Sequence, residues 1–236
     1  MRRPFLLLVA CLLLAPQATL AASQWGGSVM LASNHLQRGV SRSSNDPSVS
    51  AEAHVQSADL WFAGLWASTS RVRQAEPTTV ELAATVGLGT ALGADWVVRG
   101  SYSHYETPWQ DPDYYRYDEL MVDLRWREAL LLSATWSPEI ARYAPGFGAQ
   151  RGHVQAYEIS YQHSLRGGFR TWAGGGYYDL SDLFGDGYWY GSIGAGWGRG
   201  PWQLDVSYVH PDASAERLSA PGLARRRALA QLSFAF

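Results

Sequence analysis

Polar and apolar residues alternate along most of this chain, and the alternation constrains the fold more than any other feature. In the segments 80–88, 120–126, 202–208 and 228–236, every second residue is apolar. Because successive side chains of a β-strand point to opposite faces, each segment predicts a strand with one apolar and one more polar face. Beyond the apolar run at residues 5–15, no apolar run is long enough for a transmembrane helix. The pattern therefore predicts an all-β protein.

The spacing of these segments predicts about 12 strands. They are expected near residues 26–42, 48–57, 60–70, 78–92, 95–106, 114–127, 129–138, 151–164, 168–179, 187–199, 201–210 and 224–236. Short connections near 58–59, 93–94, 128, 167 and 200 take turns with longer ones at 43–47, 71–77, 107–113, 139–150, 180–186 and 211–223. Short turns at one end and long loops at the other are typical of bacterial outer-membrane barrels. We expect a closed antiparallel transmembrane β-barrel in an up-and-down meander of 10 to 12 strands.

A soluble β-sandwich or lipocalin-like barrel is the alternative, since either would also alternate. The aromatic composition favours the membrane. The chain has 13 Tyr and 11 Trp against 7 Phe, and many of these amphipathic rings fall near the ends of the expected strands. Membrane barrels carry such rings in a girdle at each interface.

The first 21 residues have the layout of a secretory signal peptide. Arg2 and Arg3 precede the short apolar run 5–15, and small residues follow near Ala21 and Ala22. Residues 8–11 also resemble a lipoprotein box, which would instead place a lipid on Cys11. We expect cleavage near residue 21, leaving residues 22–236 as a single barrel domain in the outer membrane.

The last strand carries two further predictions. Phe234 and Phe236 lie on its apolar face and resemble the signal that the barrel-assembly machinery reads. Arg225, Arg226 and Arg227 precede it and would lie at the outer rim if both chain ends are periplasmic. Because guanidinium groups bind phosphate in bidentate fashion, these arginines could contact lipopolysaccharide, although a solvated rim would have the same composition.

Charged residues on the polar faces of the strands indicate a lined pore. The pore-lining candidates are Arg38, Glu52, Glu81, Arg99, Asp123, Arg125, Glu158 and Asp205. Rings of charged side chains tune the selectivity of pores. The alternative is that opposite charges pair across the interior and plug it. A barrel of about 12 strands lies between filled 8-strand barrels and open 16-strand porins, so both outcomes stay open.

Signals for chemistry are sparse. His163 and Ser164 invite comparison with outer-membrane lipid hydrolases, but adjacent strand residues face opposite sides and cannot act together readily. We find no phosphate loop, zinc-protease motif or cysteine-based metal site in the sequence, and we predict no catalytic, cofactor or metal residues. A net charge of −2 argues against nucleic acid as a partner.

Two stretches carry a resemblance to a known family. Residues 33–43, Ser-Asn-His-Leu-Gln-Arg-Gly-Val-Ser-Arg-Ser, are similar to the opening motif of Gcw_chp, a proteobacterial family of outer-membrane proteins of uncharacterised function. Residues 62–68 are similar to a third-strand segment of that family, while His35 stands where the family has Tyr. The resemblance implies a membrane barrel and no particular activity.

These observations together predict a porin-like passive channel for small solutes or a structural surface barrel. A lipid-directed hydrolase of the phospholipase or lipid A deacylase type is the alternative. The partners that we expect are outer-membrane lipid, lipopolysaccharide, the barrel-assembly machinery and small solutes.

Overall fold

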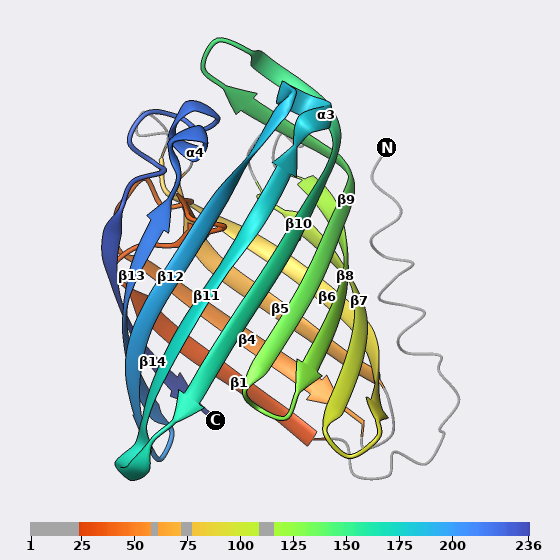
Figure 1. Cartoon of the computed structure of the whole chain (residues 1–236), viewed down its shortest axis with the longest axis vertical. Coiled ribbons are helices and arrows are strands. Elements are labelled where there is room, and N and C mark those ends of the chain that lie inside the picture. Colours follow the sequence, from red (N-terminus) through yellow and green to blue (C-terminus); the bar gives the residue numbers. More distant parts are fainter. Residues whose placement is uncertain (1–23, 58–60, 72–76, 109–115) are drawn as a thin grey trace.

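Twelve strands of the described chain close into one antiparallel barrel (Figure 1). The structure is a computed structural model, and it describes residues 24–57, 61–71, 77–108 and 116–236. Each strand pairs with its neighbours in sequence order, and β1 pairs with both β4 and β14. The prediction of a closed up-and-down barrel of about 12 strands is therefore confirmed.

The barrel strands run as follows: β1 Gln24–Ala32, β4 Ser48–Gln56, β5 Trp61–Ser70, β6 Thr79–Leu92, β7 Trp96–Glu106, β8 Arg116–Trp126, β9 Leu130–Ala144, β10 Gly148–Ser164, β11 Phe169–Leu180, β12 Asp186–Arg199, β13 Trp202–Pro211 and β14 Arg227–Ala235. Three short helical turns are η1 Arg166–Gly168, α3 Ser181–Phe184 and α4 Ala213–Arg217. None of the helices among the described residues has the length and apolar character needed to cross a membrane.

The barrel closes where β1 meets β14. Phe236 donates its backbone N–H to the carbonyl of Gly27 at 3.0 Å and accepts from the N–H of Gly27 at 3.0 Å. The register continues through the pairs Val29 with Phe234 and Leu31 with Leu232. This seam gives the first and last strands the backbone partners that an open sheet edge would lack.

The apolar face of the barrel points outward and is exposed. Val86, Ile193 and Val206 each expose more than half of their surface. A soluble barrel buries its apolar face, whereas a membrane barrel presents it to lipid. The outward apolar face therefore decides against the soluble alternative, which the alternation alone left open.

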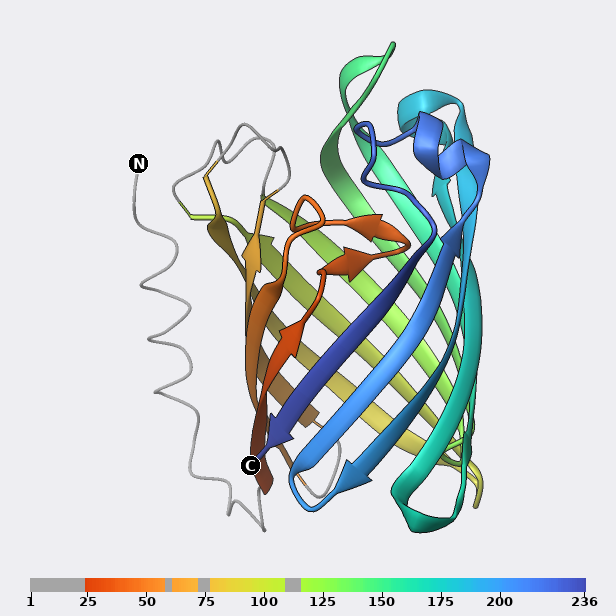
Figure 2. The same cartoon turned by 90° about the vertical axis from the view of Figure 1, so that its left-hand side faces the viewer.

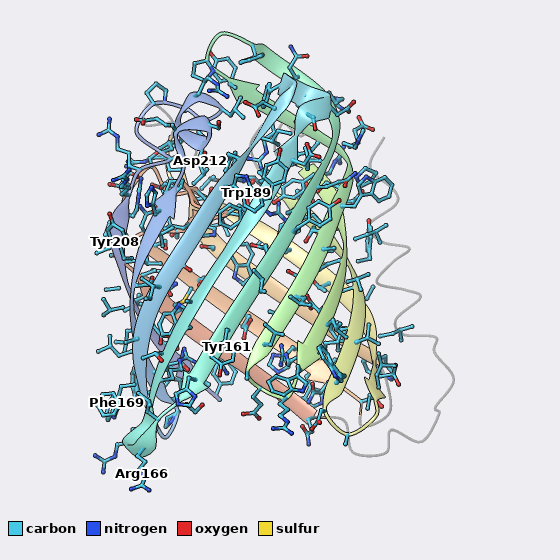
Figure 3. The ribbon with its side chains drawn as sticks, viewed as in Figure 1. Tyr161, Arg166, Phe169, Trp189, Tyr208 and Asp212 are labelled. Atoms are coloured by element: carbon cyan, nitrogen blue, oxygen red, sulfur yellow. The ribbon has the colours of Figure 1, made fainter. Side chains whose placement is uncertain are left out.

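Aromatic side chains mark both ends of this outer face. Tyr161 and Phe169 lie toward the short-turn end, while Trp189 and Tyr208 lie toward the long-loop end (Figure 3). All four are exposed. This placement agrees with the two expected interfacial girdles.

The expected first strand, 26–42, was wrong in its second half. β1 ends at Ala32, and the chain then forms a separate hairpin from β2 Leu36–Gln37 and β3 Val40–Ser41 before β4 begins at Ser48. The hairpin lies at the long-loop end of the barrel (Figure 2). Arg38 and Gly39 both have positive φ, of 50° and 79°, and form the turn that reverses the chain between β2 and β3.

The expected long loop at 139–150 was also wrong. β9 continues to Ala144 and β10 begins at Gly148, so a tight turn joins two strands that rise above the rest of the barrel (Figure 1). A register shift between Gly152 and Val154 accommodates the extension. α3 packs beside β10, where the Asp182 carboxylate accepts the backbone N–H of His153 at 3.0 Å. The expected signal peptide, residues 1–21, lies outside the described residues.

We predict that Gly27→Ala destabilises the seam. A Cβ at Gly27 would lie 2.6 Å from the carbonyl oxygen of Glu52 and 2.8 Å from the Phe236 ring, so backbone or ring must move. Overpacking of this kind costs about 1–3 kcal/mol. The measurement is urea unfolding of the purified protein in detergent. Gly100→Ala is the control, because a Cβ there meets nothing within 4 Å. Equal unfolding midpoints for the two variants would contradict the prediction.

Candidate functional site, a hairpin inside the barrel

The segment between β1 and β4 folds inward as a tight hairpin. Arg38 and Gly39 form its turn, and two successive residues of positive φ are the signature of a type I′ turn. A Cβ on Gly39 would lie 3.0 Å from Cβ of Tyr190 on β12 and 3.3 Å from Cβ of Pro211 on β13. The tip of the hairpin thus abuts the barrel wall, and only glycine fits both the turn and this approach.

Short polar side chains fasten the base of the hairpin. The Asn34 amide oxygen accepts from the hydroxyls of Ser41 at 2.8 Å and Ser43 at 3.1 Å. The Ser43 hydroxyl also accepts the backbone N–H of His35 at 3.0 Å. The Ser41 N–H donates to the carbonyl of Leu223 in the loop before β14. These polar groups are buried, and their mutual hydrogen bonds offset the free-energy cost of removing them from water.

Two buried ion pairs join the hairpin to the opposite wall. Arg38 Nη2 lies 3.0 Å from Glu119 Oε1 on β8, and the two side chains are only 8% and 9% exposed. Arg42 Nη2 lies 2.9 Å from Glu81 Oε1 on β6, with 12% and 3% exposure. Removing one partner from such a pair leaves an uncompensated buried charge, which costs about 3–5 kcal/mol. The hairpin is therefore held in place by charge as well as by backbone bonds.

Tyrosine side chains contact Arg38 and the polar groups near it. Its carbon lies 4.8 Å from the centroid of the Tyr178 ring, a cation–π distance. Tyr117 accepts from the Gln37 side-chain amide at 3.3 Å, and Tyr190 donates its hydroxyl to Glu158 at 2.5 Å. These contacts form a layer of arginine, glutamate and tyrosine side chains around the hairpin.

The layer separates two regions of the lumen. Toward the long-loop end, a pocket of about 100 Å³ lies between Arg42, Arg142, Tyr178 and the loop 218–223. Toward the short-turn end, a cavity of about 530 Å³ is lined in part by Arg125, Arg170, Asp205 and Gln231. A cavity of about 210 Å³ lies beside Ser133, Glu158 and Ser192 between them. The lumen is thus hollow below the hairpin and narrow at it.

The structure places the predicted pore-lining residues on the inner side of the wall. Along each strand, these residues alternate with apolar neighbours that point outward, and they lie on the face that contacts the hairpin. The pore-lining residues on barrel strands are Glu52, Glu81, Arg99, Asp123, Arg125, Glu158 and Asp205. Arg38 is the exception, because it enters the lumen from the hairpin turn. Arg99 and Asp123 face each other across β7 and β8, and Arg99 lies 4.7 Å over the Phe62 ring.

Four further charged residues of the interior were not predicted. Glu119 has the same strand parity as Asp123, and Arg170 has that of Trp172, so alternation could have found both. Arg170 pairs with Asp205 at 2.8 Å. Arg42 and Arg142 had no such signal, because one lies in an unforeseen hairpin and the other in a segment expected to be a loop.

The three rim arginines divide into two kinds. Arg227 donates to the backbone carbonyl of Leu223 at 2.9 Å and contacts Asn45, so it ties two loops together. Arg225 and Arg226 are exposed. Contact with lipopolysaccharide stays a prediction for all three residues.

The histidines do not form a catalytic group in the described chain. His163 is exposed on the outer face of β10, and Ser164 follows on the other face beside the short turn at η1. His104 points outward and pairs with Asp118 at 2.7 Å, whereas His35 lies inside against the Trp66 ring at 5.5 Å. Across the described residues, no three His, Cys, Asp or Glu side chains gather as a metal site would require.

Comparison with known proteins supports the fold. No family model matches the chain, and no curated protein matches it, so the resemblance of residues 33–43 to Gcw_chp stays a prediction. Among solved structures, the chain is similar to the KdgM porin in complex with disordered oligogalacturonate, with a TM-score of 0.55 and 6% identity over 91% of this chain and 99% of that one. It is also similar to the NanC porin, with a TM-score of 0.57 and 10% identity over 89% and 97%.

We predict that acid loosens the hairpin through His35. Burial lowers the pKa of the His35 imidazole below its ordinary value of 6.5; the Glu81 carboxylate opposes this shift and the Arg42 guanidinium adds to it. The His35 imidazole therefore takes up a proton at a higher pH when the hairpin is released from the barrel wall than when the hairpin is docked there. Docking is fully stable above about pH 6.5 and weakens as the pH falls below it.

Hydrogen exchange of residues 33–47, followed by mass spectrometry and corrected for the intrinsic pH dependence, measures this effect. The His35→Asn variant supplies the control, because its protection should no longer depend on pH in this range. Protection that falls equally in both proteins would assign the effect to another group.

Proposed function

We propose that this protein is an outer-membrane, porin-like channel that passes small polar solutes through a constriction formed by the β2–β3 hairpin. The observation that carries the proposal is the hollow lower lumen of a twelve-strand barrel. Cavities of about 530 and 210 Å³ lie there beside charged and hydroxyl side chains. A barrel with a purely structural role would fill this space with side chains, as small barrels do.

The charges of the lumen support passage of polar solutes. Arg170 with Asp205, and Arg99 facing Asp123, place both signs on the wall of the lower lumen. Mixed charges keep an interior wet and reduce the cost of moving a hydrated solute through it. The structural neighbours agree with this function, since both are porins and one holds an oligogalacturonate.

In this proposal the hairpin sets the size limit. It crosses the lumen at the long-loop end, which we assign to the cell exterior, and the two ion pairs hold it there. The apolar outer face contacts lipid. The proposal also includes Phe234 and Phe236 as an assembly signal and Arg225, Arg226 and Arg227 as contacts of lipopolysaccharide phosphates.

A plugged surface barrel is the second candidate, and one observation favours it. The Arg38–Glu119 and Arg42–Glu81 pairs are almost fully buried, and such pairs would oppose opening of the hairpin. The hydrolase alternative gains nothing from the geometry, because His163 and Ser164 face opposite sides of the wall.

Planar-bilayer recording distinguishes channel from plug. We expect wild type to give small, discrete conductance steps in potassium chloride. The double variant Arg38→Ala with Arg42→Ala should give steps several times larger, because Glu81 and Glu119 lose their counter-ions and the hairpin is released. Arg151→Gln, which removes an exposed arginine paired with Glu139, is the control and should match wild type.

The heat-dependent gel shift of a membrane barrel shows that each variant is folded before it is recorded. Folded wild-type protein that gives no channel events at all would overturn the channel and leave the plugged barrel. Equal conductance in wild type and the double variant would instead remove the hairpin as the constriction.

A further inference from the structure

The small pocket at the long-loop end lies above the hairpin, on the side from which an external solute would arrive. β3 and Arg42 form its floor, β9 contributes Ile140 and Arg142, and residues 218–223 cover it. Its volume is about 100 Å³. A buried water needs roughly 10–15 Å³. The pocket therefore has room for a compact solute and not for a long oligomer.

Arg142 brings to this pocket a positive charge that acts on the Glu81 carboxylate at longer range but forms no direct ion pair among the described residues. Its Nη2 donates to the Tyr178 hydroxyl at 3.0 Å, and its guanidinium carbon lies 5.3 Å from the Tyr178 ring centroid. No Asp or Glu of the described chain lies within ion-pair distance of it, whereas Arg42 is paired with Glu81. A partly buried guanidinium with only a neutral partner is an attractive place for an anion.

Two hydrogen-bond donors at the pocket lack acceptors. The Nε–H groups of Arg42 and Arg142 are buried and meet no acceptor within the described part of the chain. Buried donors are rarely left in this state, and an unpaired donor on a charged group is especially costly. An anion in the pocket would supply an acceptor after a small rotation of either side chain.

The remaining walls are aromatic and aliphatic. Tyr117, Tyr178 and Tyr188 line the pocket, together with Leu218 and Leu223 of the loop. These surfaces favour an apolar body, while the arginines favour a carboxylate.

We propose that the pocket binds a small carboxylate with a compact apolar or aromatic body, held by Arg142. This inference deepens the proposed function and rests on it, because the pocket lies at the outer entrance of the proposed channel.

Benzoate is the probe, and isothermal titration of the folded protein in detergent is the measurement. We expect saturable binding of benzoate and none of benzamide, which has the same shape without the charge. Arg142→Gln should weaken benzoate binding by roughly tenfold or more, as expected for the loss of a charge-assisted hydrogen bond. Arg142→Lys should keep part of the affinity, and Arg151→Gln should keep all of it.

The proposed site would be overturned if benzoate did not bind to wild type or if benzamide bound as tightly as benzoate. Full benzoate affinity in the folded Arg142→Gln variant would also overturn it. Inorganic phosphate that binds as tightly as benzoate would remove the apolar body from the proposal. The wild-type comparison of benzoate with benzamide needs no variant, so misfolding of a variant cannot decide the outcome. Binding without conductance would overturn the channel alone, and conductance without binding would overturn this site alone.

Discussion

Closure of the backbone hydrogen-bond network is the constraint on which the rest of the structure depends. Lipid offers no partner to an N–H or C=O group, so a strand in the membrane needs a neighbour on both sides. The seam between β1 and β14, with its reciprocal bonds of Gly27 and Phe236, completes the ring of paired strands. Once the ring is closed, apolar side chains face out and charged side chains share one interior.

The interior then has to accommodate charges of both signs in a small space. Strand residues such as Glu81 and Glu119 meet arginines that come from a different part of the chain, the β2–β3 hairpin. The hairpin therefore serves as counter-ion to the wall and as an obstacle in the lumen. Arg142 donates to the Tyr178 hydroxyl and forms no direct ion pair among the described residues, so the pairing of charges is incomplete there.

Regular alternation accounts for most of what could be predicted. β6, β13 and β14 follow their predicted segments closely because each has one consistently apolar face. The prediction failed where the local pattern was ambiguous. Residues 33–42 contain enough alternation to imitate a strand, yet Arg38 and Gly39 adopt positive φ. The extended β9 and β10, with the turn between them, carry Pro138, Gly146 and Gly148, which are typical of a loop.

By itself the sequence determined the strand class, the approximate number of strands and the inward charges, since a period of two is a local property of the chain. It could not determine which faces meet, because that depends on contacts between residues about 40 to 80 positions apart, such as Arg42 with Glu81 and Arg38 with Glu119. Only the tertiary structure decided that the apolar face is exposed, that the first loop fills the upper lumen, and that a pocket with an unpaired guanidinium lies above it. Closing the ring brings those distant residues together.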